Sequence, residues 1–289
     1  MVIIIKKGKT KLILILLFIL CIIRIYIDHN WIKKKYFEVS SPKIPTSFDG
    51  YKILHLSDLH GKNFGEQIMK KIEEESPDIV VMTGDMVSGT DTEFSAFYQL
   101  SEKLIQRYPV FYIMGNHEGR MEPGYYPQIV AKLKELGVTV LDNEKVILEK
   151  GNEKVNLYGM WCHQKYYCKK TKEIDEFMTK ETVSKILGNC DKTQYNLLLM
   201  HTPLYFKAYR QWGADLVFCG HIHGGMIHIP FLGGLFSPHF EFFPEYCEGE
   251  YTKDGATMIV SGGLGKGETG FRVCNRPEIM IVTLRSNKK

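Results

Sequence analysis

The chain has 289 residues, of which 44% are hydrophobic and 24% are charged, so it can bury a core and is not expected to be disordered. Residues 1–40 hold eight Lys/Arg against two Asp/Glu, whereas the remainder holds 29 against 31. The body therefore has no block of basic residues that could follow a phosphate backbone, and no nucleic-acid partner is expected.

The first predicted element is the apolar segment 12–27, LILILLFILCIIRIYI, which follows four lysines. Its 16 residues fall short of the roughly 20 that span a bilayer, but extension to Trp31 supplies 20. We predict an uncleaved single-pass membrane anchor at residues 1–35. A cleaved secretory signal and a buried helix are the alternatives, and the lack of a small-residue cleavage site after residue 27 favours the anchor.

The side of the membrane is not determined by charge, because lysines flank the apolar segment at both ends. The commoner N-in orientation favours a body outside the cytoplasm, held at the cell membrane. Residues 36–50 are polar and contain proline, which predicts a linker, and the main folded domain is expected at 51–289. The oligomeric state is left open.

Apolar runs bounded by turn residues predict strands along the body, and helix-like segments lie between the earlier runs. The expected strands are 51–56, 79–82, 110–114, 155–160, 197–200, 216–219, 258–260 and 279–284. The expected helices are 66–75, 92–107, 127–136 and 171–187. This alternation predicts an α/β domain with a largely parallel sheet, followed by a second, mixed sheet. The seven cysteines form no CxxC pair, so buried or free thiols are expected.

Polar residues follow five of these strands at their carboxyl ends, where open α/β sheets bind ligands. In chain order they are Asp58 and His60, Asp85, Asn116 and His117, His201, and finally His221 and His223. Each motif alone is weak, since a D-x-H triplet occurs by chance and Asp85 could simply cap a turn. Together they predict a metal centre, and Asp, Asn and His donors without Cys suit Mn, Fe or Zn.

The other histidines carry weaker expectations. His55 lies inside the first strand of the body and is expected to be buried there or to support a ligand. His163, His228 and His239 are expected at the surface or lining a pocket.

The blocks DLH, GDMV, GNHE, the lone His201 and GHIHGG resemble the calcineurin-like metallophosphoesterase superfamily over about residues 50–285. The segments SGGLG and NRPEI resemble its membrane-associated bacterial subgroup of the YkuE and YaeI type. The resemblance implies a four-layered α/β/β/α sandwich of two mixed sheets flanked by helices. Met226 and Gly262 stand where the subgroup often has Gln and Arg, which affects substrate contacts rather than ligands.

The resemblance also implies roles for the site residues. Asp58, His60 and His223 would hold one divalent metal; Asn116, His201 and His221 would hold the second, with Asp85 bridging both. His117 would be the catalytic proton donor or charge stabiliser. The family favours manganese.

The predicted function is a dinuclear-metal phosphoric ester hydrolase, a phosphodiesterase or phosphatase, in which a metal-bridging hydroxide attacks phosphorus. The expected substrate is a phosphorylated small molecule or lipid, or an envelope component, because residues 226–251 hold seven Phe/Tyr close to the predicted membrane. A packed loop is the simpler explanation of those aromatic residues. The alternative function is a non-catalytic protein that binds metal or phosphate on the same fold.

Overall fold

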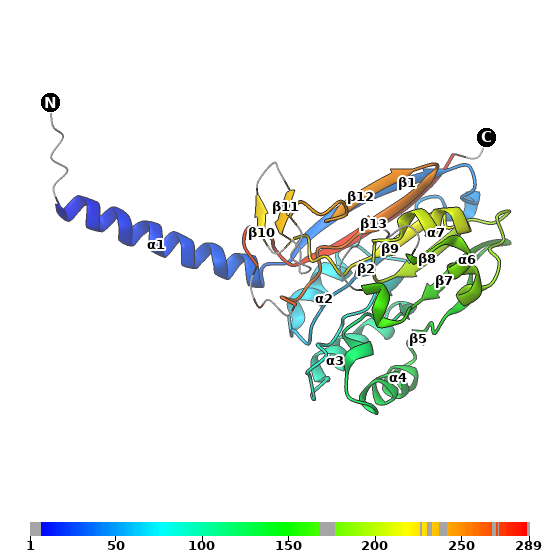
Figure 1. The fold of residues 1–289 in the computed structure, drawn as a ribbon, viewed down its shortest axis with the longest axis horizontal. Coiled ribbons are helices and arrows are strands. Elements are labelled where there is room, and N and C mark those ends of the chain that lie inside the picture. Colours follow the sequence, from blue (N-terminus) through cyan, green and yellow to red (C-terminus); the bar gives the residue numbers. More distant parts are fainter. Residues whose placement is uncertain are drawn as a thin grey trace.

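The computed structural model describes residues 7–167, 177–225, 227–229, 233–236, 242–267, 270 and 272–287 (Figure 1). Helix α1 (Lys7–Asn30) extends away from a body in which the other elements gather. Within its segment Thr10–Asn30, an 18-residue window has a mean hydropathy of 2.5 and contains no buried residue, so the helix is long and apolar enough to cross a membrane. A membrane anchor and a signal sequence share these properties.

The first sheet contains six strands in the order β1-β14-β2-β3-β4-β5. Neighbouring strands are parallel except β14 and β2, which run antiparallel. The strands are β1 (Lys33–Ser41), β2 (Lys52–Leu56), β3 (Ile79–Met82), β4 (Val110–Tyr112), β5 (Thr139–Val140) and β14 (Glu278–Ser286).

The second sheet also contains six strands, in the order β12-β13-β9-β8-β7-β6, and is antiparallel only at its two edges. Its strands are β6 (Glu144–Lys150), β7 (Glu153–Met160), β8 (Asn196–Met200), β9 (Leu216–Cys219), β12 (Gly249–Lys253) and β13 (Ala256–Val260). A separate antiparallel ribbon is formed by β10 (Ile227–Ile229) and β11 (Gly233–Phe236), close to the end of α1 (Figure 1).

Helices cover the outer face of each sheet. The helices on the first sheet are α2 (Glu66–Glu73), α3 (Ser95–Ile105) and α4 (Tyr125–Leu136), and those on the second are α6 (Lys180–Leu187) and α7 (Phe206–Trp212). Three short 3-10 helices occupy Thr46–Phe48, Glu118–Arg120 and Gln164–Tyr167. The resulting order of layers, helix, sheet, sheet, helix, confirms the predicted α/β sandwich of two mixed sheets.

Successive side chains of β2 pack into two different hydrophobic cores. Leu54 and Leu56 pack with the helices of the first layer, whereas Ile53 packs between the two sheets. Successive side chains of a strand point to opposite faces, so a strand covered on both faces reads as a nearly continuous apolar run. His55 therefore points toward the second sheet, where its ring meets Phe218 edge-on at 5.3 Å, and its buried position agrees with the expectation.

The body begins earlier than the apolar runs indicate. Residues 33–41 form β1, which pairs in parallel with β14 over nine positions, although a linker was expected from residue 36. The strand escapes sequence detection because it lies at a sheet edge and only Val39 is buried in it. The division into anchor, linker and domain stays a prediction.

Two further expectations meet the structure only in part. The helix expected at 171–187 is present as α6, Lys180–Leu187, while 171–176 lies outside the described residues. The six described cysteines are free thiols, as expected, and Cys168 lies outside the described residues.

Candidate metal centre

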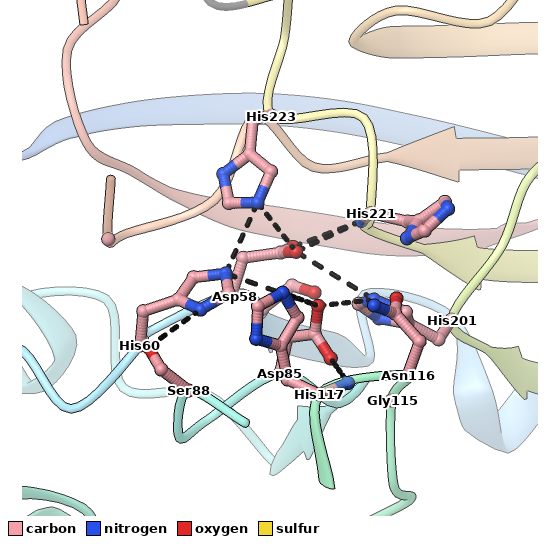
Figure 2. A network of polar contacts seen from close by, with 12 residues as sticks. Asp58, His60, Asp85, Ser88, Gly115, Asn116, His117, His201, His221 and His223 are labelled. Carbon is pink, nitrogen blue, oxygen red and sulfur yellow. Dashed lines mark hydrogen bonds and ion pairs between the residues drawn. The ribbon is translucent and has the colours of Figure 1, made fainter. Parts of the chain in front are cut away.

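The eight predicted site residues come together at one end of the two sheets (Figure 2). The first sheet supplies those that follow β2, β3 and β4, and the second supplies those that follow β8 and β9. All except His60 are less than 9% exposed as whole residues, and the side chain of His60 is itself 3% exposed. Residues more than 100 positions apart in sequence thus share one small volume.

Five of these residues turn the chain sharply at the strand ends. Their φ angles are positive: 54° at Asp58, 49° at His60, 51° at Asp85, 74° at His221 and 56° at His223. Non-glycine residues rarely adopt this left-handed conformation, which costs about 1–3 kcal/mol each and tends to occur at functional sites. Hydrogen bonds between the turns hold them: the Asp58 amide donates to the Gly84 carbonyl and the His60 amide to the Asp85 carbonyl, each at 3.0 Å.

Asp58, His60 and His223 form the first cluster of possible metal donors. The Nε2 atom of His223 lies 3.4 Å from Asp58 Oδ1 and 3.2 Å from His60 Nε2. Figure 2 shows these three side chains directed at one another. Two facing ring nitrogens and a carboxylate oxygen suit a shared cation.

Asp85, His201 and His221 form a second cluster. His201 Nδ1 lies 2.6 Å from the Thr83 carbonyl, which only accepts, so this nitrogen carries a proton. The neutral ring then presents a bare Nε2 to the carboxylates, 3.1 Å from Asp85 and 3.8 Å from Asp58. A bare nitrogen beside carboxylate oxygens requires a proton or a metal ion between them.

Asp85 occupies the middle of the site. Its Oδ2 lies within 4.0 Å of ring nitrogens of His60, His117 and His201, so it reaches both clusters. Its Oδ1 accepts a hydrogen bond from the His117 amide at 2.7 Å. This position fits a carboxylate that bridges two ions.

Asn116 places an unpaired acceptor beside His201 (Figure 2). Its Oδ1 is buried and has no hydrogen-bond partner among the described residues, although buried amide oxygens are normally paired. Its backbone carbonyl accepts from Gln164 Nε2 at 2.6 Å, which fixes the loop. The orphaned oxygen fits a neutral metal ligand.

The charges of the centre are strongly perturbed. Burial raises the pKa of Asp58 to about 6, against the opposing charge of His201. Burial alone would lower the pKa of His201, but Asp85 and Asp58 raise it to about 9. For Asp85, burial is outweighed by His201, and its pKa is held well below its usual range. Two buried carboxylates thus depend on a nearby positive charge, which protonated His201 or divalent ions would supply.

His117 has a defined tautomer. The Gly89 amide donates to His117 Nδ1 at 3.0 Å, so the neutral ring carries its proton on Nε2. That Nε2 lies 3.8 Å from Asp85 Oδ2, on the side of the metal centre. An open cavity of about 600 Å³ adjoins His117 and is also lined by Arg120, Ser88, Asp91 and Gly267.

Two glycines permit the close packing of the turns. A Cβ on Gly115 would lie 2.3 Å from Asp85 Oδ1, and one on Gly220 would lie 2.3 Å from Asp58 Oδ2. Side chains at these positions would displace the carboxylates. Gly115 of GNHE and Gly220 of GHIHGG therefore allow the backbone to lie in contact with the two carboxylates.

Several residues that support the site are missed by the sequence reasoning. Glu118 is 1% exposed and accepts from the amides of Asp85, Met86 and Gly115 at 2.8–2.9 Å. Asn275 donates to the carbonyl of His223 at 2.5 Å. Only their positions within the GNHE and NRPEI segments could have pointed to them. The spacing of the predicted ligands does not reveal that these two side chains bind backbone groups of other loops.

Two more residues support the site or the loop behind it. Arg272 is buried and donates to the carbonyls of Gly265 and Gly262 at 2.7 and 2.5 Å. The ring of Tyr167 packs against His221 and His201, with centroids 5.4 and 5.9 Å apart.

The three remaining histidines lie apart from the predicted ligands or outside the described residues. His163 is exposed and His228 lies 3.2 Å from Glu248, while His239 lies outside the described residues.

Comparison with known proteins places this arrangement in a family. Metallophosphoesterase YkuE of Bacillus subtilis, which is uncharacterized, is 27% identical over 271 residues, covering 90% of this chain and 88% of its own. Phosphodiesterase YaeI of Escherichia coli is 28% identical over 244 residues, covering 81% and 82%. Phosphopantetheinyl hydrolase PptH of Mycobacterium tuberculosis is similar in structure, with 16% identity, a TM-score of 0.47 and coverage of 76% and 90%.

The family model described as calcineurin-like phosphoesterase matches residues 51–225, which is more than half of the chain. The match spans the turns after β2, β3, β4, β8 and β9, which hold all eight predicted site residues. The chain belongs to the calcineurin-like phosphoesterase family.

Proposed function

We propose that the chain is a metal-dependent phosphoesterase that uses two divalent ions, with manganese favoured by the family. The observation that carries this proposal is the convergence of buried carboxylate, imidazole and amide donors from both sheets on one small volume. Membership of the family supports hydrolysis as the reaction class.

Asp58, His60 and His223 would hold one ion, and Asn116, His201 and His221 the other, with Asp85 shared. When bound, divalent ions at such a site supply Lewis-acid charge and lower the pKa of water toward neutrality. The chain itself fixes the donors: Thr83 orients His201, and the turn hydrogen bonds hold the two carboxylates. Preformed donors need no rearrangement during reaction.

His117 is proposed to donate a proton or stabilise charge on the leaving group. Its Nε2–H faces the centre because Nδ1 is already paired with the Gly89 amide. Arg120 lines the adjoining cavity and would attract an anionic substrate. General acid catalysis by a positioned side chain contributes about 10²–10⁴-fold.

The proposed substrate is a phosphate ester or pyrophosphate of a lipid or envelope component, handled by an enzyme anchored in the cell membrane with its body outside the cytoplasm. The apolar exposed helix α1 supports this. So do the exposed aromatic side chains of Phe242 and Phe243, in the aromatic-rich stretch whose residues 226, 230–232 and 237–241 lie outside the described residues.

The decisive experiment measures metal content and turnover of bis-p-nitrophenyl phosphate with manganese. Asp85→Ala should lose bound metal and hydrolysis together, because its carboxylate reaches both clusters. His117→Ala should keep its metal and lose about 10²-fold or more in kcat. The matched control is His163→Ala, an exposed histidine outside the centre.

Full turnover by Asp85→Ala would disprove the site assignment. Stoichiometric metal binding without turnover on any phosphate ester would favour the alternative, a non-catalytic binding protein. The complete set of donors and the oriented His117 support the enzyme.

A further inference from the structure

The C-terminal end of α1 is fixed to the body by buried polar contacts. Asp28 is 1% exposed, and its carboxylate is paired with Arg24 within the helix at 2.9 Å. The same carboxylate accepts a hydrogen bond from the Cys274 amide at 2.7 Å. A buried, charge-assisted contact of this kind holds the last turn of the helix against the segment 272–276.

Further contacts follow along the chain. His29 Nε2 lies 3.2 Å from the Arg272 amide, which donates to it. Arg276 donates to the Trp31 carbonyl at 2.9 Å, and its guanidinium lies 5.9 Å from the Trp31 ring. The Lys33 amide then donates to the Pro277 carbonyl and β1 begins. No free segment separates helix from sheet, so the direction of α1 relative to the body is set.

The segment 272–276 also supports the metal centre. Asn275 donates to the carbonyl of His223, and Arg272 donates to carbonyls of the loop at 262–265. One short segment therefore contacts both the end of α1 and the turn that carries a predicted ligand. The distance from the helix to the centre is fixed by these bonds.

Exposed apolar side chains surround the end of α1. Tyr26 and Trp31 are 68% and 57% exposed, and Val273 lies between the two residues that bind Asp28 and His29. The His228 amide of β10 donates to the Val273 carbonyl. Phe236, at the end of β11, pairs with Phe242 in an isolated antiparallel bridge. Figure 1 shows this ribbon beside the helix end. Aromatic side chains are enriched at membrane–water interfaces.

Basic side chains lie between these exposed apolar side chains and the metal centre. Lys62 donates to the His29 carbonyl. Lys266, Lys62 and Arg272 all lie close enough to act electrostatically on His29, so three cations surround it. Lys266 is flanked by glycines that pack against predicted ligands: Cβ atoms on Gly265 and Gly267 would lie 2.9 and 3.0 Å from His60 and His223.

We propose that this docking face, formed by Tyr26, Trp31, Lys62, Phe242, Lys266 and Val273, rests on the surface of an anionic lipid bilayer crossed by α1. The aromatic residues lie at the level of the lipid headgroups. The lysines, which lie between the bilayer and the metal centre, contact anionic headgroups. The bilayer is the occupant because the apolar helix leaves the body at this face with its side chains uncovered. The inference rests on the proposed membrane anchor and adds the orientation of the centre.

Tryptophan fluorescence quenching in nanodiscs tests the orientation without an activity assay. The full chain is reconstituted in discs that contain phosphatidylglycerol and lipids brominated near the headgroup. Tryptophan is introduced by Phe242→Trp at the docking face, by Leu17→Trp in α1, and by Ile147→Trp on β6 as a matched exposed control. The signal of the parent protein, which has three tryptophans, is subtracted.

The expected result is strong quenching for Leu17→Trp, and at least twofold more quenching for Phe242→Trp than for Ile147→Trp. Lys266→Gln should lessen the quenching at position 242, since one basic residue near an anionic surface contributes about fivefold in binding; Lys132→Gln on α4 should not. Strong quenching at 17 with equal, weak quenching at 242 and 147 overturns the docking face and leaves the anchor standing. No quenching at 17 overturns both. An unchanged signal in Lys266→Gln overturns the role of the cations.

Discussion

Glu118 illustrates how a single buried side chain can organise the turns of the candidate metal centre. Its two carboxylate oxygens accept the amides of Asp85, Met86 and Gly115, which belong to two separate loops. Burial and the nearby Asp85 raise the pKa of Glu118 to about 7. The backbone around Asp85 and the backbone before Asn116 are thus held by one buried acceptor.

Glu118→Ala should destabilise the protein by about 3 kcal/mol or more, because three buried amides would lose their acceptor at about 1–3 kcal/mol each. Metal affinity should fall with it. Urea unfolding and metal analysis measure both effects, with exposed Glu122→Ala as the control. Equal stability of the two variants would show that the amides find other partners.

His55 predicts a pH dependence of stability. Burial, and secondarily the charge of His201, lowers its pKa to about 3, whereas an unfolded histidine titrates near 6.5. The folded chain therefore binds fewer protons between these values. The contribution of neutral His55 is complete above about pH 6.5 and is lost as the pH falls, at up to about 1.4 kcal/mol per pH unit.

His55→Gln should remove this contribution while keeping a partner for Thr83, whose hydroxyl lies 2.7 Å from His55 Nε2. Between pH 6.5 and 5.5 the free energy of unfolding of the metal-free parent should fall by about 1 kcal/mol more than that of the variant. The measurement is urea unfolding in EDTA, where other histidines contribute equally to both proteins. Parallel pH curves would contradict the buried neutral state.

At the scale of elements, β1 makes the residues after α1 part of the first sheet. Its nine pairs with β14, together with buried Val39 and the preceding buried Ile32, tie residues 32–41 to the core. Each such side chain stabilises the fold by about 1.5–3 kcal/mol. The strand also covers one edge of β14, which would otherwise expose unpaired backbone groups.

Removal of residues 1–27 should leave a folded body, whereas removal of 1–41 should lower Tm by about 10 °C or more and promote aggregation. Thermal unfolding and gel filtration of the two truncated proteins make the comparison. Similar Tm values for both would show that β1 contributes little.

The elements also show what sequence can predict. The buried parallel strands are found because both faces are apolar. The residues that come together at the candidate site could be picked out because they follow such strands. β1 is missed because an edge strand with charged residues lacks the regular spacing of apolar residues that predicts a strand. Glu118 and Asn275 are missed as supports because their partners are backbone groups from other loops, and one-dimensional spacing does not encode them.

At the scale of the whole molecule, the proposed ions would connect the two sheets. Asp58, His60 and Asp85 come from the first sheet, whereas His201, His221 and His223 come from the second. Bound ions would therefore add links across the sandwich at this end. Binding only to the folded state raises stability by about 2.7 kcal/mol per site at a hundredfold excess over Kd.

Manganese should accordingly raise Tm by about 5 °C or more at such an excess, and EDTA should reverse the shift. Asp85→Ala should show no shift, which differential scanning calorimetry can test. A metal-independent Tm in a catalytically active protein would mean that the ions are not held by both sheets.

The direct junction between α1 and β1 has a consequence for the fate of the protein. Proteases that release ectodomains cut exposed, extended connections. Here residues 28–41 are held by hydrogen bonds to the segments 272–277 and 278–286. If α1 is the proposed membrane anchor and the body lies outside the cytoplasm, the body would therefore resist shedding. Its proposed hydrolytic activity would then stay with the cell that made it rather than pass into the medium.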